Sequence, residues 1–286
     1  MPLIVSQKSR RGNKKIISLG LCCVLLNVGI IYYGQNYLRT INSIQAQEAK
    51  AKYEEELAIR ERSRIEEINM YKPNGNPRSV LDDLHYLVLT KGQAKVSTFG
   101  SSVTNGDGAS SPEKKWHNVL DRYLVSLNGL GQVTIQSNAF PGYSTEMVVF
   151  NHYEDKIIAE KPDIILFETF VLNDHGQSIP LQETRDNLDF MIKKLKENVP
   201  NAKIILLSPN PKIDASPNGS GATYKEYVDL TAEVAHFYQL DYIDIYDSFM
   251  QTKLGLNVML KDGVHPNDFG YQIWFDALKE FFSLKK

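Results

Sequence analysis

The chain has 286 residues, 42% hydrophobic and 23% charged, a composition typical of a folded protein with room for one α/β domain and some further chain. Its 32 Lys and Arg nearly balance its 34 Asp and Glu, so the net charge of −2 gives no case for a nucleic-acid partner, which needs a basic face. The two cysteines, Cys22 and Cys23, are adjacent in an apolar run, which excludes a disulfide framework and a cysteine-ligated zinc site.

The first predicted element is an apolar helix over residues 16–34. No charged residue occurs between positions 16 and 38, and a helix of about 19 residues crosses the hydrocarbon layer of a membrane. Residues 1–15 carry Lys and Arg but no acidic residue, so the positive-inside rule predicts a cytoplasmic basic tail, with everything after residue 34 outside. Tyr32 and Tyr33 lie at the end of the run, where interfacial aromatics belong.

Three alternatives to a signal anchor fit this segment less well. A cleaved signal peptide has an apolar region of about 7–15 residues and a small-x-small cleavage site, whereas this run is longer and residues 32–35 make a poor site. A lipoprotein signal has small residues before its cysteine, where this chain has Leu21. A buried core helix would not have basic and then polar flanks. We therefore predict an uncleaved, single-pass anchor in the cell membrane.

A second helix is predicted over residues 41–71, which are rich in Glu, Ala, Lys, Arg and Gln and contain no Pro or Gly. Its sparse apolar positions do not sustain heptads, so a solvated stalk is favoured over a coiled coil that would make dimers. The turn-forming residues 72–77 end the stalk and linker, which together span residues 35–77. A separate domain is predicted over residues 78–286.

Helical and strand patterns alternate through this domain. Helices are predicted over residues 78–91, 112–127, 145–160, 181–198, 221–238 and 267–284, and strands over residues 94–99, 132–137, 163–170, 203–208 and 241–245. Five strands separated by helices predict a three-layer α/β/α fold with a parallel sheet. In such sheets ligands bind beyond the carboxyl ends of the strands, so functional residues are expected just after them.

Residues suited to acyl-transfer chemistry follow the predicted strands or precede the last helix. They are Ser101, Ser102, Gly142, Asn173, Asp174, His175, Asp262 and His265. A serine hydroxyl is a weak nucleophile near neutral pH and needs a base, and a histidine base needs a carboxylate to hold its tautomer. Asp262 precedes His265 by three residues and can reach its imidazole locally.

Acyl transfer also needs hydrogen-bond donors at the developing oxyanion. The backbone N–H groups of Ser102 and Gly142 and the side-chain amide of Asn173 can supply them. Each motif alone is common in turns, loops or helix caps, so it is their joint occurrence, in order and at strand ends, that indicates one site.

Four blocks of the chain resemble the SGNH/GDSL hydrolase family, over most of residues 95–286. Gly100 to Val103 resembles its Gly-Asp-Ser-Leu block, Asn138 to Gly142 its glycine block, and Val171 to Asp174 its Gly-x-Asn-Asp block, while its Asp-x-x-His block is intact as Asp262 to His265. The resemblance implies a flavodoxin-like fold and a catalytic triad of serine nucleophile Ser102, base His265 and orienting Asp262. It also implies an oxyanion hole of Ser102, Gly142 and Asn173, and no cofactor.

Two residues depart from the family blocks. Ser101 stands where the family usually has Asp, and Val171 where it usually has Gly, which indicates a divergent branch with its own pocket shape. Ser101 is also a rival nucleophile, although Ser102 matches the family serine. Ser101, Asp174 and His175 are candidates for the pocket wall. No spacing of His, Asp and Glu makes a convincing metal site.

The anchor and the four blocks together predict an extracytoplasmic serine esterase or deacetylase. An O-acylated cell-envelope or capsular polysaccharide is the expected substrate class, with a small ester as a simpler one. Activity should rise as His265 loses its proton. An O-acetyltransferase built from the same residues, and a glycan-binding protein that has lost the chemistry, are the alternatives that the sequence leaves open.

Overall fold

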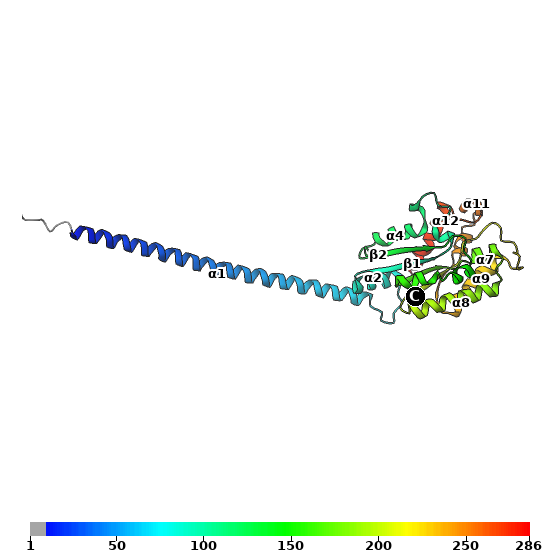
Figure 1. Ribbon diagram of the computed structural model, residues 1–286, viewed down its shortest axis with the longest axis horizontal. Coiled ribbons are helices and arrows are strands. Elements are labelled where there is room, and N and C mark those ends of the chain that lie inside the picture. Colours follow the sequence, from blue (N-terminus) through cyan, green and yellow to red (C-terminus); the bar gives the residue numbers. More distant parts are fainter. Residues whose placement is uncertain (1–9) are drawn as a thin grey trace, which may run out of the picture. The chain divides into compact units, whose positions relative to one another are not determined.

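The computed structural model describes residues 10–286, and it describes side chains from residue 18 onward. Close contacts divide the chain into two units, Met1–Glu66 and Glu67–Lys286. The helix α1 (Arg10–Tyr71) forms the described part of the first unit and enters the second (Figure 1). The predicted anchor and stalk are therefore parts of one uninterrupted helix. Of the predicted tail over residues 1–15, the first nine lie outside the described residues.

The N-terminal part of α1 is apolar and exposed. Its most apolar window has a mean hydropathy of 1.4, and none of that window is buried within the protein. A helix of this length and composition can cross a membrane, and a signal sequence near an N-terminus has the same properties.

The first helix that lies wholly within the second unit is α2 (Val80–Lys91). Ser79 caps this helix in a capping box: its hydroxyl accepts the Asp82 N–H at 3.1 Å, and the Asp82 carboxylate accepts the Ser79 N–H at 2.9 Å. The cap explains why the helix starts two residues after the predicted position 78. Arg78 exchanges backbone hydrogen bonds with Lys286, so the two ends of the domain meet.

Five parallel strands form the sheet. They are β1 (Ala94–Gly100), β2 (Val133–Ala139), β3 (Ile164–Glu168), β4 (Lys203–Leu207) and β5 (Asp241–Ile243), in the order β2-β1-β3-β4-β5. This is the flavodoxin-like order, in which the chain changes direction across the sheet between β1 and β3. The predicted three-layer, flavodoxin-like fold with five parallel strands is confirmed, and the crevice at the carboxyl ends of β1 and β3 is the expected place for a ligand.

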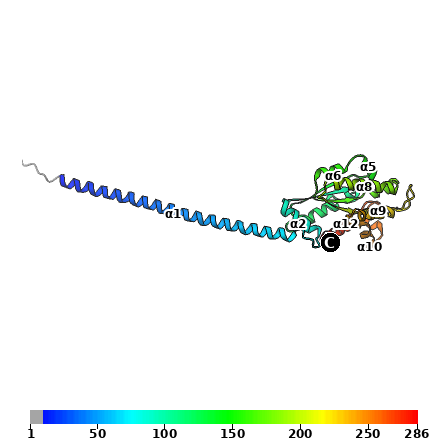
Figure 2. The ribbon, with the colours of Figure 1, turned by 90° about the horizontal axis from the view of Figure 1, so that it is seen from below.

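Helices cover both faces of the sheet. One face packs against α2, α4 (Trp116–Ser126), α10 (Ile245–Gln251), α11 (Leu256–Met259) and α12 (Asp268–Ser283). The other packs against α5 (Thr145–Phe150), α6 (Glu154–Glu160) and α8 (Leu181–Asn198). Two helices, α7 (Val171–Gln177) and α9 (Tyr224–Phe237), contribute to both cores. Figure 2 shows α5, α6 and α8 on one side and α10 and α12 on the other. Side chains alternate between the two cores along β3: Ile164 and Leu166 enter one, Ile165 and Phe167 the other.

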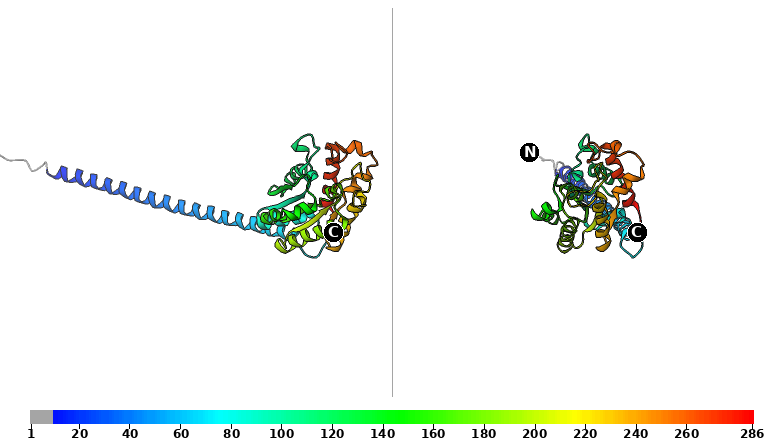
Figure 3. Two further views of the ribbon diagram at one scale, coloured as in Figure 1. Left: turned by 45° about the vertical axis from the view of Figure 1, so that its right-hand side comes forward. Right: turned by 90° about the vertical axis from the view of Figure 1, so that its right-hand side faces the viewer.

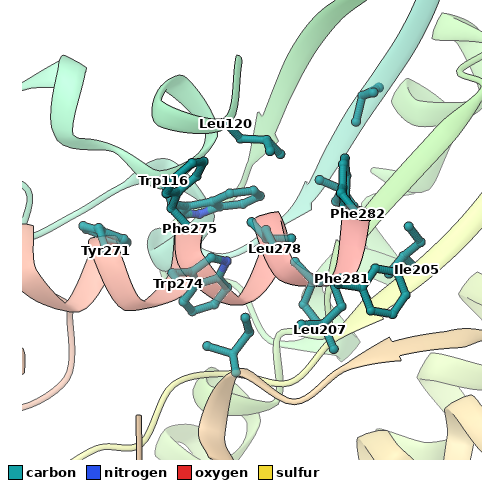
Figure 4. Close-up of a cluster of buried hydrophobic side chains, with 14 of the residues drawn as sticks. Trp116, Leu120, Ile205, Leu207, Tyr271, Trp274, Phe275, Leu278, Phe281 and Phe282 are labelled. Carbon is teal, nitrogen blue, oxygen red and sulfur yellow. The ribbon is translucent and has the colours of Figure 1, made fainter. Parts of the chain in front are cut away.

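Aromatic side chains anchor α12, the helix that follows the predicted catalytic histidine. Trp274 stacks on Trp116 of α4 with ring centroids 5.8 Å apart, and both rings are fully buried (Figure 4). Figure 3 shows the red C-terminal helix beside the blue-green segment that contains α4. Because large buried rings fix the position of α12, they also fix the C-terminal end of the turn that leads into this helix.

Some predicted element boundaries are wrong. The helix predicted over residues 145–160 is broken between α5 and α6, where His152 has a positive φ of 55°. The helix predicted from residue 112 begins as the 3-10 turn η1 (Pro112–Lys114) before α4. The short helices α3 (Ser102–Asn105), α7, α10 and α11 were not predicted, because one or two turns give too little periodicity to distinguish a helix from a loop.

Candidate active site

Ser102, His265 and Asp262 meet at the carboxyl edge of the sheet. The Nε2 atom of His265 lies 2.9 Å from the Ser102 hydroxyl oxygen, and its Nδ1 atom lies 2.8 Å from an Asp262 carboxylate oxygen. The serine and histidine are 163 positions apart in the sequence. These contacts make one continuous hydrogen-bond chain from carboxylate through imidazole to hydroxyl, the arrangement in which a serine can be activated.

The Asp262–His265 segment is a tight turn held by its own bonds and by donors of the segment after β4, the Ile213 N–H to the Gly263 carbonyl and the Asn210 amide to the Val264 carbonyl, both at 2.8 Å. The Asp262 Oδ1 atom accepts the backbone N–H groups of Val264 at 3.0 Å and His265 at 2.8 Å. Partial burial acts to raise the pKa of Asp262, but the hydrogen bonds from His265 and Val264 outweigh it and lower the pKa to about 2. Asp262 is therefore an anion at neutral pH, able to hold the Nδ1–H of the imidazole.

Ser102 is the first residue of α3 and is almost fully buried. Ser101 is the N-cap, and its hydroxyl accepts the Val103 N–H at 3.3 Å. The Val103 carbonyl accepts hydrogen bonds from the Trp116 indole and the Tyr271 hydroxyl, both at 3.2 Å. The nucleophile turn, residues 100–104, is thus tied to α4 and α12 as well as to β1.

Glu168, at the end of β3, lies directly beneath this turn and was missed in the sequence. Its carboxyl group accepts the Ser101 N–H and, at 3.2 Å, the Thr104 hydroxyl. The side chain is fully buried, and burial raises its pKa despite these hydrogen bonds. A charged residue at the end of an otherwise apolar buried strand was the available signal, because such a residue is buried only with partners.

The residues expected to bind an oxyanion lie at the start of α3, in the loop after β2 and in α7, and these segments are bonded to one another. The Phe140 N–H donates to the Gly100 carbonyl at 2.8 Å, and the Asn173 amide donates to the Tyr143 carbonyl at 2.8 Å. One N–H of the Asn173 amide is therefore used within the protein and one remains. Gly142 has a φ of +79°, which favours glycine, and no atom lies within 4 Å of a Cβ added there, so its backbone is open to a ligand.

The sequence profile of the GDSL-like lipase/acylhydrolase family matches residues 98–273, more than half of the chain. The chain belongs to this family. It is an ester-hydrolysing serine hydrolase, and the resemblance noted in the sequence is confirmed. No curated protein matches the chain.

Solved structures share the fold of this hydrolase. An acetyl xylan esterase, AlAXEase, is 21% identical with a TM-score of 0.56, covering 65% of this chain and 98% of that one. An acetylxylan esterase from Geobacillus stearothermophilus is 18% identical with a TM-score of 0.56, covering 67% and 94%. A lipolytic G-D-S-L family member from Veillonella parvula is 18% identical with a TM-score of 0.53, covering 66% and 98%. Catalytic mutants of the Geobacillus enzyme have a serine or a histidine replaced by alanine.

Asp174 and His175, the candidates for the pocket wall, are buried in the hydrolase. The Asp174 carboxylate accepts the backbone N–H and the hydroxyl of Thr145, both at 2.7 Å, and burial raises its pKa to about 6. The His175 Nε2 atom lies 2.9 Å from the Ser216 carbonyl oxygen, and burial lowers the pKa of its imidazole. Both side chains are buried, as is that of Ser101, because partners from distant segments cover them.

The described residues contain no group of three or more His, Cys, Asp or Glu side chains placed to hold a metal ion. His117, outside the site, is buried beside Trp116, and burial lowers its pKa to about 4.

Proposed function

We propose that this hydrolase is an extracytoplasmic esterase that removes acyl groups, acetyl above all, from O-acylated cell-envelope or capsular polysaccharide. The observation that carries the proposal is the unbroken hydrogen-bond chain Ser102–His265–Asp262. The acetylxylan esterases that share its fold support an acetylated polysaccharide as the substrate class.

The reaction begins with attack of the Ser102 Oγ atom on the ester carbonyl carbon while His265 Nε2 takes the hydroxyl proton. Asp262 keeps the proton of the imidazole on Nδ1 and stabilises the imidazolium. The carbonyl oxygen gains negative charge, which the N–H groups of Ser102 and Gly142 and the remaining N–H of the Asn173 amide stabilise. Collapse of the tetrahedral intermediate breaks the bond to the sugar oxygen, which takes the proton from Nε2.

The second half of the reaction releases the acid. A water molecule gives a proton to His265 Nε2 as it attacks the acyl group on Ser102, and the proton then returns to the Ser102 oxygen as the carboxylic acid leaves. The acid–base turn is open to solvent, with 25% of the His265 side chain and 52% of the Asp262 side chain exposed. Water can therefore reach the acyl group on Ser102 from this side.

We assign α1 the role of tether. In this assignment residues 1–15 are a cytoplasmic tail, residues 16–34 span the cell membrane, residues 35–77 are a stalk and linker, and residues 78–286 are the catalytic domain on the outer side. The apolar, fully exposed window of α1 and the basic residues before it support this order. A domain held this way meets envelope polymers at short range.

Acetate release tests the activity. Full-length protein in detergent micelles is incubated with acetylated xylan and with p-nitrophenyl acetate, and Ser102→Ala serves as the matched control. The proposal predicts acetate from both substrates with the wild type and none above background with Ser102→Ala. Equal release by the two proteins, or none by the wild type from either substrate, would contradict it.

A further inference from the structure

A pocket of 740 Å³ adjoins the acid–base turn. Its wall consists of Asp107, Gly108, Ala109, Ser110, Lys261, Asp262, His265, Asn267, Asp268 and Phe269. The loop over residues 107–110 forms one side, and the segment from residue 261 into the first turn of α12 forms the other. Two of its residues, Asp262 and His265, belong to the candidate triad.

The two sides of the pocket are fixed to each other. Ser110 donates its backbone N–H at 2.8 Å and its hydroxyl at 2.6 Å to the Asp268 carboxylate. Gly108 has a φ of +94°, and a Cβ there would lie 2.4 Å from the Pro266 carbonyl oxygen, so only glycine allows this close approach. The pocket therefore has defined walls and does not depend on closure of a loop.

The chemistry of the lining suits a neutral sugar. Phe269 is 45% exposed, so one part of its ring is free to cover the apolar face of a pyranose. Carboxylates accept hydrogen bonds from sugar hydroxyls, and three aspartates are present. Hydrogen bonds from Ser110 lower the pKa of Asp268, which keeps it ionised. Three aspartates against one lysine, Lys261, repel an anionic sugar.

The proposed reaction places the leaving sugar on the same side. His265 delivers its proton to the sugar oxygen as the ester bond breaks, so the sugar must lie next to the imidazole when it leaves. In the proposed reaction the carbonyl oxygen of the acyl group faces Gly142 and Asn173, which do not line this pocket. When the acylated sugar residue of a glycan lies at His265, the neighbouring part of the glycan chain lies beside this pocket.

Building on the proposed function, we propose that this pocket is a glycan subsite, which binds a neutral sugar residue of the acylated chain with Phe269 as its stacking platform. Specificity for neutral over uronate-containing polysaccharides follows from the charge of its walls. The subsite acts on the polymer and contributes little to binding of a small ester, which does not reach α12.

Substitution of the platform tests the subsite. The ratio of kcat/KM for acetylated xylan to kcat/KM for p-nitrophenyl acetate is measured for full-length wild type, Phe269→Ala and Phe269→Tyr. We expect Phe269→Ala to lower this ratio about tenfold, mainly through KM for the polymer, and Phe269→Tyr to restore it because the ring is kept.

Phe237→Ala is the matched control. Phe237 is 71% exposed at the end of α9, and since α9 runs back from the carboxyl edge of the sheet, this residue lies far from the site. The inference predicts an unchanged ratio in this variant. It also predicts that wild type cleaves acetylated xylan with a kcat/KM about tenfold above that for acetylated alginate, a uronate polymer, because of the carboxylates.

An unchanged ratio in Phe269→Ala, or no preference for the neutral polymer, would overturn the subsite. Failure of the proposed function gives a different result, since wild type would then release no acetate from acetylated xylan.

Discussion

The two halves of the candidate triad are built in opposite ways. The nucleophile turn, residues 100–104, is buried: Ser102 is 5% exposed, and its neighbours bond to β3, α4 and α12. The acid–base turn, residues 262–265, is open: Asp262 accepts hydrogen bonds from within the turn, and the Ile213 N–H and the Asn210 amide donate to its Gly263 and Val264 carbonyls. The position of the serine therefore depends on buried contacts with several elements, whereas the imidazole is oriented by an exposed carboxylate three residues before it.

This difference separates two kinds of variant. Changes in the acid–base turn should lower activity and leave the folding free energy nearly intact, because exposed groups contribute little to it. Changes beneath the nucleophile turn should lower the stability of the domain. Activity should then fall because less of the protein is folded. The chain's only tryptophans, Trp116 and Trp274, stack in the core, so their fluorescence reports unfolding of the domain.

The largest effect is expected from Ser102→Ala. Loss of the nucleophile should lower kcat for p-nitrophenyl acetate by about 10⁴-fold or more, as in other serine hydrolases. The neighbouring Ser101→Ala removes a helix cap and a side-chain hydrogen bond to Glu168, so we expect about 2 kcal/mol of lost stability and activity within about tenfold of wild type. If Ser101→Ala abolished turnover while Ser102→Ala did not, the nucleophile would be wrongly assigned.

Asp262→Asn should come next, with a fall in kcat of about 10²- to 10⁴-fold. An amide cannot carry the negative charge that holds the Nδ1–H and stabilises the imidazolium. Since the Asp262 pKa is about 2, the wild-type carboxylate is ionised over the whole neutral range and does not itself limit activity there. Steady-state kinetics and urea unfolding are measured together, and a loss of stability as large as the loss of activity would contradict the comparison.

Glu168→Ala tests the buried side. The change leaves the Ser101 N–H without its acceptor and opens a cavity, which we expect to cost about 3 kcal/mol of unfolding free energy. Glu168→Gln keeps the shape of the side chain and one acceptor oxygen for the Ser101 N–H. Urea unfolding followed by tryptophan fluorescence should therefore rank wild type, Glu168→Gln and Glu168→Ala in falling order. Equal stability of all three would remove Glu168 from the account.

The smallest predicted effect is on the pH dependence of stability, to which two buried groups contribute with opposite signs. Burial lowers the pKa of His117 from 6.5 to about 4, so as the pH falls through this range the unfolded chain takes up the proton first and stability falls. Burial raises the pKa of Asp174 from 3.8 to about 6, so over its range the folded protein takes up the proton first and stability rises with falling pH. Each is worth up to about 3 kcal/mol and the two nearly cancel.

Single variants should expose these opposed effects. As the pH falls from 6.5 to 4, His117→Gln is expected to become more stable relative to wild type, and Asp174→Asn less stable. Urea unfolding at four pH values measures both. Parallel curves for all three proteins would show that neither group titrates as its burial implies.

The sequence predicted the local features of the site better than the long-range ones. Asp262 and His265 are three residues apart, so their contact follows from spacing alone. Contact of His265 with Ser102 needed the resemblance to a family, since no local rule joins positions 163 apart. The strand ends were found because apolar runs stop there.

The misses depend on contacts between distant segments. Glu168 ends a run of apolar residues and gave no local sign that it would support Ser101. Asp174 and His175 follow a strand as pocket residues do, yet Thr145 and Ser216, from segments about 30 and 41 residues away, bond to them and help bury them. The break at His152 is a backbone conformation that residue preferences do not specify.

Covalent trapping tests the central claim, that the hydroxyl activated by His265 is that of Ser102. Full-length protein is treated with a fluorophosphonate, digested, and analysed by mass spectrometry to locate the labelled residue. The account predicts a single adduct on Ser102, absent in Ser102→Ala and strongly slowed in His265→Ala. An adduct on Ser101, or labelling that persists when residue 102 is alanine, would contradict it.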